Sequence, residues 1–207
     1  MFDDRRDAGR QLGKALEKYK EEEPLVLAIP RGGVEVGSEV AKHLDAEFSI
    51  IVARKLQLPD NPEAGFGAIA EDGSVYVIPE AKLWLDPALM KKVQKEQKKE
   101  LERRIKVLKD GKKLPRIKGR TVILVDDGIA MGSTVRSCVM LLRNKKAAKI
   151  IVAAPVSGRE IFQKLQALVD DVVILNTPPF FTAVATSYRN WYDVSDEEVM
   201  EILKSWE

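Results

Sequence analysis

The sequence has 207 residues, a formal net charge of +2, 45% hydrophobic residues and 32% charged residues. This length allows one domain with a full hydrophobic core, and the composition is that of an ordinary globular protein. The single cysteine excludes an internal disulfide framework, and the single histidine has no partners at metal-ligand spacing, which argues against a zinc site. No apolar run reaches membrane-spanning length and the charged start has no apolar signal segment, so we expect a cytoplasmic protein without a membrane partner.

Helices and strands alternate along the first half of the chain. In chain order, the hydrophobic pattern predicts a helix around residues 12–19, a strand at 25–29, a glycine turn and helix over 30–44, a strand at 48–53 and a proline-rich, charged loop over 53–65. A hairpin is expected over 66–78, because the Asp-Gly pair at 72–73 separates two short β-prone runs. Asp86 and Pro87 have the character of an N-cap and a first helical residue, and the long helix that they begin ends near Gly111.

The second half of the chain repeats this alternation. In chain order it predicts a strand at 122–125, a helix at 135–142, a strand at 149–156, a helix at 157–168, a strand at 171–176 and a terminal helix from Ser195. The whole pattern predicts an α/β fold with an open, mostly parallel sheet, helices on both faces, and an inserted β-hairpin and long helix. We expect a single domain over 1–207, with residues 56–118 as an insertion of flexible loop, hairpin and basic helix, and residues 176–194 as an aromatic, hood-like loop.

The stretch VILVDDGIAMGSTV, residues 122–135, carries the clearest chemical signal. An apolar strand ends in two carboxylates, Asp126 and Asp127, and a turn of small residues then leads into the next helix. The free N–H groups of a helix N-terminus bind anions, and small residues let an anion approach the backbone closely. The carboxylates would repel a bare phosphate, but they suit a ligand with hydroxyls near its phosphate, such as a sugar phosphate. They are also suitable ligands for Mg²⁺.

Two common phosphate-binding motifs are absent from the sequence. The glycines at 32 and 37 have the spacing of a P-loop, but Ser38 stands where that motif requires lysine. The sequence also has no GxGxxG dinucleotide fingerprint. The segment at 122–135 therefore belongs to another class of phosphate site.

This segment resembles the signature of the type I phosphoribosyltransferases, which bind phosphoribosyl diphosphate (PRPP). Two further segments are similar to that family in order and spacing. Residues 29–33, Ile-Pro-Arg-Gly-Gly, resemble the pyrophosphate loop, whose backbone N–H groups are often exposed by a non-proline cis peptide. The basic pair at 54–55, followed by Leu-Pro at 58–59, resembles the start of the flexible catalytic loop. The resemblance spans roughly residues 1–195.

The resemblance implies a Mg²⁺-dependent transferase that replaces the pyrophosphate of PRPP with a nucleobase or related nitrogen acceptor. The resemblance implies four catalytic residues, of which Asp126 and Asp127 hold the ribose hydroxyls and the metal, and Arg54 and Lys55 neutralise the leaving group. It also implies that Arg31, Gly32 and Gly33 hold the pyrophosphate. The 5′-phosphate would be held by the turn of Gly128, Ile129, Ala130, Met131, Gly132, Ser133 and Thr134. Closure of a loop over 56–78 would exclude water. Phe181 is the expected stacking partner of the acceptor base.

Two positions depart from the family pattern. Met131 stands where many relatives have a threonine that helps to hold the 5′-phosphate, and a thioether cannot donate a hydrogen bond. Ala130 stands where the 6-oxopurine enzymes have an aspartate that acts on the purine ring. This departure disfavours hypoxanthine and guanine as acceptors, and the sequence leaves the acceptor open.

A basic stretch over residues 91–118 leaves a second function open. It has thirteen Lys or Arg residues against four acids. A solvated helix with one apolar stripe and helpful Glu-to-basic spacing accounts for it, so nucleic acid is not the partner we expect. The alternative is a regulatory protein that senses PRPP and binds nucleic acid through this basic surface. A phosphatase with Asp126 as nucleophile is a weaker alternative, and a homo-oligomer stays open because relatives are commonly dimers or larger.

Overall fold

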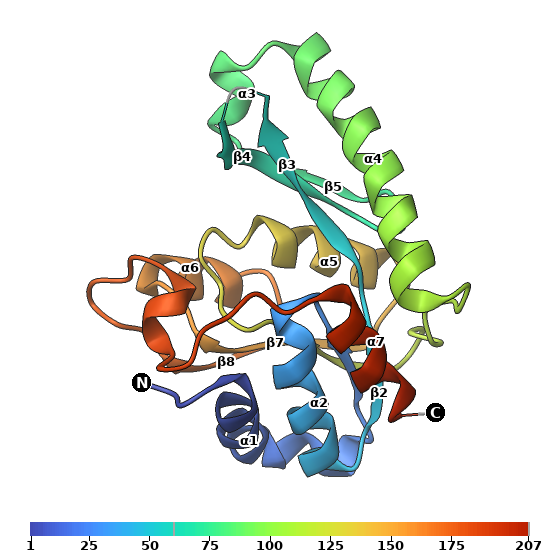
Figure 1. Ribbon diagram of the computed structural model, residues 1–207, viewed down its shortest axis with the longest axis vertical. Helices are drawn as coiled ribbons and strands as arrows, with labels where there is room; N and C mark the ends of the chain where they lie inside the picture. Colours follow the sequence, from blue (N-terminus) through green and yellow to red (C-terminus); the bar gives the residue numbers. More distant parts are fainter. Residues whose placement is uncertain (60, 207) are drawn as a thin grey trace.

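A five-stranded parallel sheet lies at the centre of the protein (Figure 1). The computed structural model describes residues 1–59 and 61–206. The strand order is β2-β1-β6-β7-β8, and every neighbouring pair is parallel. The strands are β1 (Leu25–Ala28), β2 (Glu47–Ile50), β6 (Thr121–Val125), β7 (Lys149–Val156) and β8 (Asp171–Asn176).

Helices cover both faces of this sheet. One face carries α1 (Arg5–Ala15) and α2 (Gly32–Leu44), and the other carries α5 (Ser133–Asn144) and α6 (Arg159–Gln166). Side chains alternate along β1, so that Leu25 and Leu27 join the core under α5 whereas Val26 joins the core under α2. Both faces are therefore buried, and the predicted α/β class with an open parallel sheet is confirmed.

A second, antiparallel sheet projects from one end of the main sheet (Figure 1). Its strands are β3 (Ala53–Leu58), β4 (Asn61–Ala70) and β5 (Val75–Val77). The hairpin expected around 72–73 is present as β4 and β5. The loop expected over 53–65 is wrong, because most of it belongs to β3 and β4, and the predicted strand at 48–53 is divided between the two sheets. Leu56 and Phe66 share one buried cluster, which gives this hairpin the apolar face that the prolines in the sequence obscure.

The rest of the insertion is helical. It contains α3 (Ala81–Trp84) and α4 (Pro87–Lys109), and α4 packs beside α7 (Asp196–Lys204). Short 3-10 turns lie at Glu17–Glu22 and Val184–Ser187. Asp86 accepts a hydrogen bond from the Ala88 N–H at 3.1 Å, as expected of an N-cap, and α4 ends at Lys109. Among the described residues, no helix has both the length and the apolarity needed to cross a bilayer.

The strand order reverses between β1 and β6. From β1 the chain moves outward to β2, and after the insertion it returns on the other side of β1 as β6. In open α/β sheets, ligands bind beyond the carboxyl ends of the strands at such a switch point. The segments 29–33 and 126–134 leave the carboxyl ends of β1 and β6, so the topology brings both expected site segments to this point.

A buried ion pair ties the second sheet to α4. Lys109 Nζ lies 2.7 Å from Glu71 Oε1, and only 5% and 7% of these side chains are exposed. Burial lowers the pKa of Lys109 and raises the pKa of Glu71, whereas the attraction between the two charges opposes both shifts. Each charge is therefore tolerated in the interior because the other is present.

Lys109→Met should lower the free energy of unfolding by about 3 kcal/mol, because it leaves the Glu71 carboxylate buried without its partner. The double variant Lys109→Met with Glu71→Met should lose less than the sum of the two single losses, since no unpaired charge remains. Urea unfolding of the four proteins gives the coupling energy. Strictly additive losses would show that the pair does not stabilise the junction.

Candidate functional site

The loops after β1 and β6 touch at the switch point. A Cβ added at Gly32 would lie 1.8 Å from Asp127 Oδ2, and a Cβ added at Gly33 would lie 3.0 Å from Asp126 Cα. Position 32 therefore requires glycine, and the backbone of this loop lies directly against the acidic pair. The peptide bond Pro30–Arg31 in the same loop is cis.

The turn after the acidic pair lines a pocket of about 490 Å³. Asp126, residues 128–135, Lys55 and residues 182–184 contribute to its walls. Gly132 has a φ of 72° and is the N-cap of α5, and within the described chain no side chain caps the helix at that position. The first N–H groups of α5 are therefore available to an anion in the pocket.

Arg5 of α1 occupies the centre of the site. Its Nε donates to Asp127 Oδ2 at 2.8 Å, and its Nη1 donates to the carbonyl oxygen of Tyr192 at 2.8 Å. The guanidinium also lies over the Trp191 ring, 3.9 Å from the ring centroid, in a cation–π contact. Only 3% of Arg5 is exposed. Arg5 is not among the predicted site residues, because an arginine within the charged segment DDRRD gives no sign of burial.

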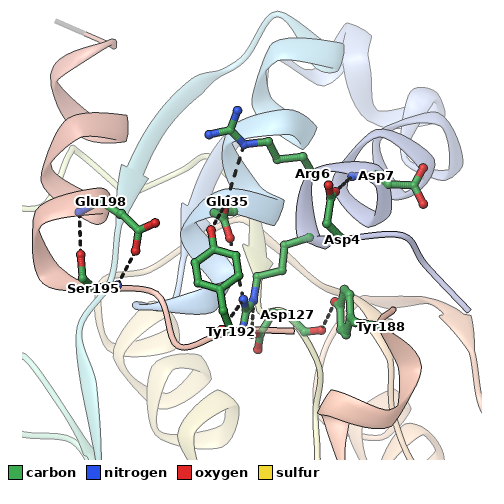
Figure 2. A network of polar contacts seen from close by, with 10 residues as sticks. Asp4, Arg6, Asp7, Glu35, Asp127, Tyr188, Tyr192, Ser195 and Glu198 are labelled. Carbon is green, nitrogen blue, oxygen red and sulfur yellow. Dashed lines mark hydrogen bonds and ion pairs between the residues drawn. The ribbon is translucent and has the colours of Figure 1, made fainter. Parts of the chain in front are cut away.

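A second carboxylate, Glu35 of α2, belongs to the same network (Figure 2). The Tyr192 hydroxyl donates to Glu35 Oε1 at 2.9 Å, and Arg5 Nη1 lies 3.8 Å from Glu35 Oε2. The Tyr188 hydroxyl donates to the backbone carbonyl of Asp127 at 2.5 Å. The first helix, the loop after β6 and the aromatic loop near the carboxyl terminus therefore meet at the acidic pair.

Burial sets the ionisation of this site. It raises the pKa of Asp126 well above its ordinary value, and the negative charge of Asp127 adds to the rise. Burial also raises the pKa of Asp127, but the hydrogen bond and the charge of Arg5 oppose that shift. Burial, with the hydrogen bond to Glu35, raises the pKa of Tyr192 to about 12. Asp127 is therefore the better stabilised anion of the pair.

The acidic pair suits a magnesium ion as part of a larger ligand set. The described part of the chain contains no group of three or more His, Cys, Asp or Glu residues placed to hold a metal. One oxygen of Asp127 is already bonded to Arg5. Mg²⁺ commonly keeps waters and binds through one or two carboxylates together with substrate phosphates. Asp126 Oδ1 accepts a hydrogen bond from the Asp127 N–H at 2.9 Å. The donor set therefore fits a metal that arrives with a phosphate ligand and binds through the remaining oxygen of Asp126.

The structure separates the two basic residues of β3. Successive side chains of a strand point to opposite faces. Lys55 lines the pocket beside the small-residue turn, whereas Arg54 Nε donates to Gln97 Oε1 of α4 at 2.7 Å. The two residues were predicted to act together on the leaving group, but their side chains face different parts of the structure.

The aromatic residues of the carboxyl-terminal loop fall into two groups. Three of them surround the Arg5 guanidinium: Tyr188, Trp191 and Tyr192. Phe181 instead lines a second pocket, of about 860 Å³, together with Ala130 and Met131. Its ring lies 3.5 Å from the position that a Cβ at Gly158 would take. Phe181 therefore remains the candidate for a stacking contact, while the first group is part of the framework around Arg5.

Comparison with known proteins identifies the family. The sequence model of the phosphoribosyl transferase domain matches residues 5–185. The chain therefore belongs to the phosphoribosyl transferase domain family, as the resemblance of its motifs predicts.

Individual relatives agree with this assignment. Two proteins from two strains of Mycobacterium tuberculosis, each provisionally named a phosphoribosyl transferase, are 41% identical to the chain over 206 residues. The alignment covers 98% of this chain but 46% of each relative, so the chain spans about half their length. The crystal structure of TT1426 from Thermus thermophilus is similar with a TM-score of 0.85 and 35% identity, over 100% of this chain and 99% of that one. The AQ2163 protein of Aquifex aeolicus shares the fold, with a TM-score of 0.53, 14% identity, and coverage of 84% and 74%.

Arg5→Gln should lower the free energy of unfolding by about 3 kcal/mol, because it leaves buried carboxylates without their cation. Arg6→Gln is the matched control: Arg6 is 63% exposed and lies 3.6 Å from Glu35, and an exposed ion pair contributes about 1 kcal/mol or less. Thermal unfolding of both variants tests the difference. Equal losses would show that the Arg5 network does not hold the site together.

Asp126→Asn should stabilise the protein near pH 7. Because its pKa is raised, folded Asp126 keeps a proton that the unfolded chain releases, so the free energy of unfolding falls as the pH rises from the ordinary carboxyl range through the raised pKa. Asparagine removes that loss, and a gain of about 1 kcal/mol raises the melting temperature by roughly 2–4 °C. A pH series of melting curves tests this. A variant that is less stable, with the pH slope of the parent, would contradict the assigned ionisation.

Proposed function

We propose that the chain transfers the 5-phosphoribosyl group of PRPP to a nucleobase or related nitrogen acceptor, with release of pyrophosphate. The observation that carries the proposal is the position of the acidic pair. Asp126 and Asp127 lie between the glycine loop 31–33 and the small-residue turn 128–134. A ligand with an anionic group at each end and a diol between them fits this order, and PRPP is such a ligand.

In this proposal the two carboxylates have different tasks. Asp126 lines the pocket and accepts hydrogen bonds from the ribose hydroxyls. Asp127 is held by Arg5 and keeps the glycine loop in register with the acidic pair. The N–H groups at the start of α5 hold the 5′-phosphate, and Lys55 adds a positive charge beside them.

The charges around the site account for the reaction step. As the bond from ribose C1 to the pyrophosphate oxygen breaks, its electron pair leaves with that oxygen, and a nitrogen lone pair forms the new bond at C1. Positively charged and N–H groups already in place stabilise the departing anion. Mg²⁺, when bound, neutralises further charge on the diphosphate.

The acceptor belongs, in this proposal, to the pocket that contains Phe181. That pocket shares Ala130 and Met131 with the pocket at the small-residue turn, so a base there would lie next to the ribose. A planar base would stack on the half-buried Phe181 ring. The alanine at 130 offers no carboxylate to a purine ring, so we infer an acceptor other than hypoxanthine or guanine.

A PRPP sensor with a nucleic-acid surface is the second candidate. The observation in its favour is the outer face of α4, where five lysines are exposed: Lys91, Lys92, Lys95, Lys98 and Lys99. Binding of a polyanion to this face would weaken steeply with added salt. The transferase is preferred because a sensor that binds PRPP alone has no need of the second pocket, which contains Phe181 and adjoins the small-residue turn.

Pyrophosphate release is the experiment that tests the transferase. The protein with PRPP and Mg²⁺ should release pyrophosphate only when a suitable base from a nucleobase panel is present. Asp126→Asn should reduce kcat/KM by about a hundredfold, because the ribose hydroxyls lose a carboxyl acceptor. Release that is independent of every base, or an unaffected variant, would contradict the proposal.

Met131→Thr should tighten PRPP binding about two- to tenfold. Met131 is 52% exposed at the phosphate turn, and a threonine hydroxyl at that position can donate a hydrogen bond that the thioether cannot. Calorimetric titration measures the change. Weaker binding would show that the backbone alone already satisfies the 5′-phosphate.

A further inference from the structure

Three arginines gather beside the glycine loop, on the side that faces α4. Arg31 is the N-cap of α2, and its Nη1 lies 3.8 Å from Asp196 Oδ1 at the start of α7. Arg54 reaches α4 through its bond to Gln97. Arg104 lies seven residues after Gln97, about two turns along the same face of that helix.

Arg104 lies at this junction with one buried donor atom that no described residue satisfies. Within the described part of the chain, its Nε is buried and has no hydrogen-bond acceptor, and Asp196 Oδ1 is buried and has no donor. Burial lowers the pKa of Arg104, the charges of Arg54 and Arg31 lower it further, and Asp196 opposes the shift. The nearby Glu100 is bonded to Arg103 at 2.6 Å. Arg31 and Arg104 therefore share one poorly bonded carboxylate, and Arg54 adds a third positive charge near Arg104.

A purely structural role does not account for this arrangement. An arginine that served to hold α4 against α7 would direct an N–H group to Asp196, and both atoms would then be satisfied. Instead, a buried donor is left open and like charges are brought together, which costs stability. Such a cluster is expected where an anion binds, because the anion satisfies the donors and removes the repulsion.

We propose that Arg104 of the inserted helix completes, with Arg31 and Arg54, the subsite that binds the departing diphosphate, and that Asp196 occupies this subsite as an internal counter-ion when the diphosphate is absent. This inference rests on the proposed function. In this arrangement α4 forms part of the diphosphate subsite. Arg54 acts there together with Arg104, whereas Lys55 acts at the pocket beside the small-residue turn. Arrival of the diphosphate displaces Asp196 and so affects the first turn of α7.

Calorimetric titration with inorganic pyrophosphate at constant Mg²⁺ tests the subsite directly, without any acceptor base. Arg104→Gln should weaken pyrophosphate binding at least about tenfold, because a charge-assisted hydrogen bond is lost. Arg103→Gln, one residue away on the exposed side of α4, is the matched control and should change the affinity by less than about twofold. Asp196→Asn should tighten binding, since the competing carboxylate is removed. A folding defect cannot produce changes of opposite sign in the two variants.

The outcomes separate this inference from the proposed function. The parent protein could release pyrophosphate from PRPP while Arg104→Gln binds pyrophosphate as tightly as the parent. The assignment of the subsite would then be wrong, and the proposed transferase activity would stand. Alternatively, Arg104→Gln could weaken and Asp196→Asn could tighten pyrophosphate binding while no base supports release of pyrophosphate from PRPP. The assignment of the subsite would then stand, and the proposed transferase activity would be wrong. An equal loss of pyrophosphate affinity in Arg104→Gln and Arg103→Gln would also overturn the inference. It would show that the net positive charge of α4, and not a bond from Arg104, determines the affinity.

Discussion

The ion pair between Arg5 and Asp127 is the interaction on which the site depends. It joins the first helix to the loop after β6, and through Tyr192 and Trp191 it includes the carboxyl-terminal loop. Two adjacent carboxylates in a buried position would otherwise repel each other and take up protons. One guanidinium, stacked on an aromatic ring and 3% exposed, reduces that repulsion and fixes the geometry of Asp127.

This constraint explains how one carboxylate is left for the ligand. Asp127 is bonded to Arg5 through its side chain and to Tyr188 through its backbone carbonyl, so it is part of the framework. Asp126 remains at the wall of the pocket, with a raised pKa that reflects the cost of leaving it there. The buried Asp126 carboxyl therefore lowers the free energy of unfolding, as is common for residues of a ligand-binding site.

The fold, and the two segments that meet at the switch point, were readable from the sequence because they depend on local patterns. The aliphatic strands, the glycines at 32 and 33 and the acidic pair each follow from residues close together in the chain. The second sheet was not predicted over 53–65, since proline and charge at its turn mask a hairpin whose apolar face is completed by α4. The burial of Arg5 was not predicted, because it arises from contacts with residues far away in the sequence, such as Asp127 and Tyr192. The position of Arg104 beside Arg31, Arg54 and Asp196 likewise depends on the tertiary fold. The assignments of roles within the site stay predictions.

Titration with PRPP, and with each of its two halves, tests whether the two loops at the switch point form one site. In the proposed arrangement one anion subsite lies on each side of the acidic pair. PRPP with Mg²⁺ should therefore bind more tightly than either ribose 5-phosphate or inorganic pyrophosphate, and pyrophosphate should compete with PRPP. Asp126→Asn should reduce PRPP affinity while leaving pyrophosphate affinity nearly unchanged, since only the ribose loses an acceptor. If PRPP binds no better than ribose 5-phosphate, or does not bind at all, the two loops at the switch point do not form a single site for it.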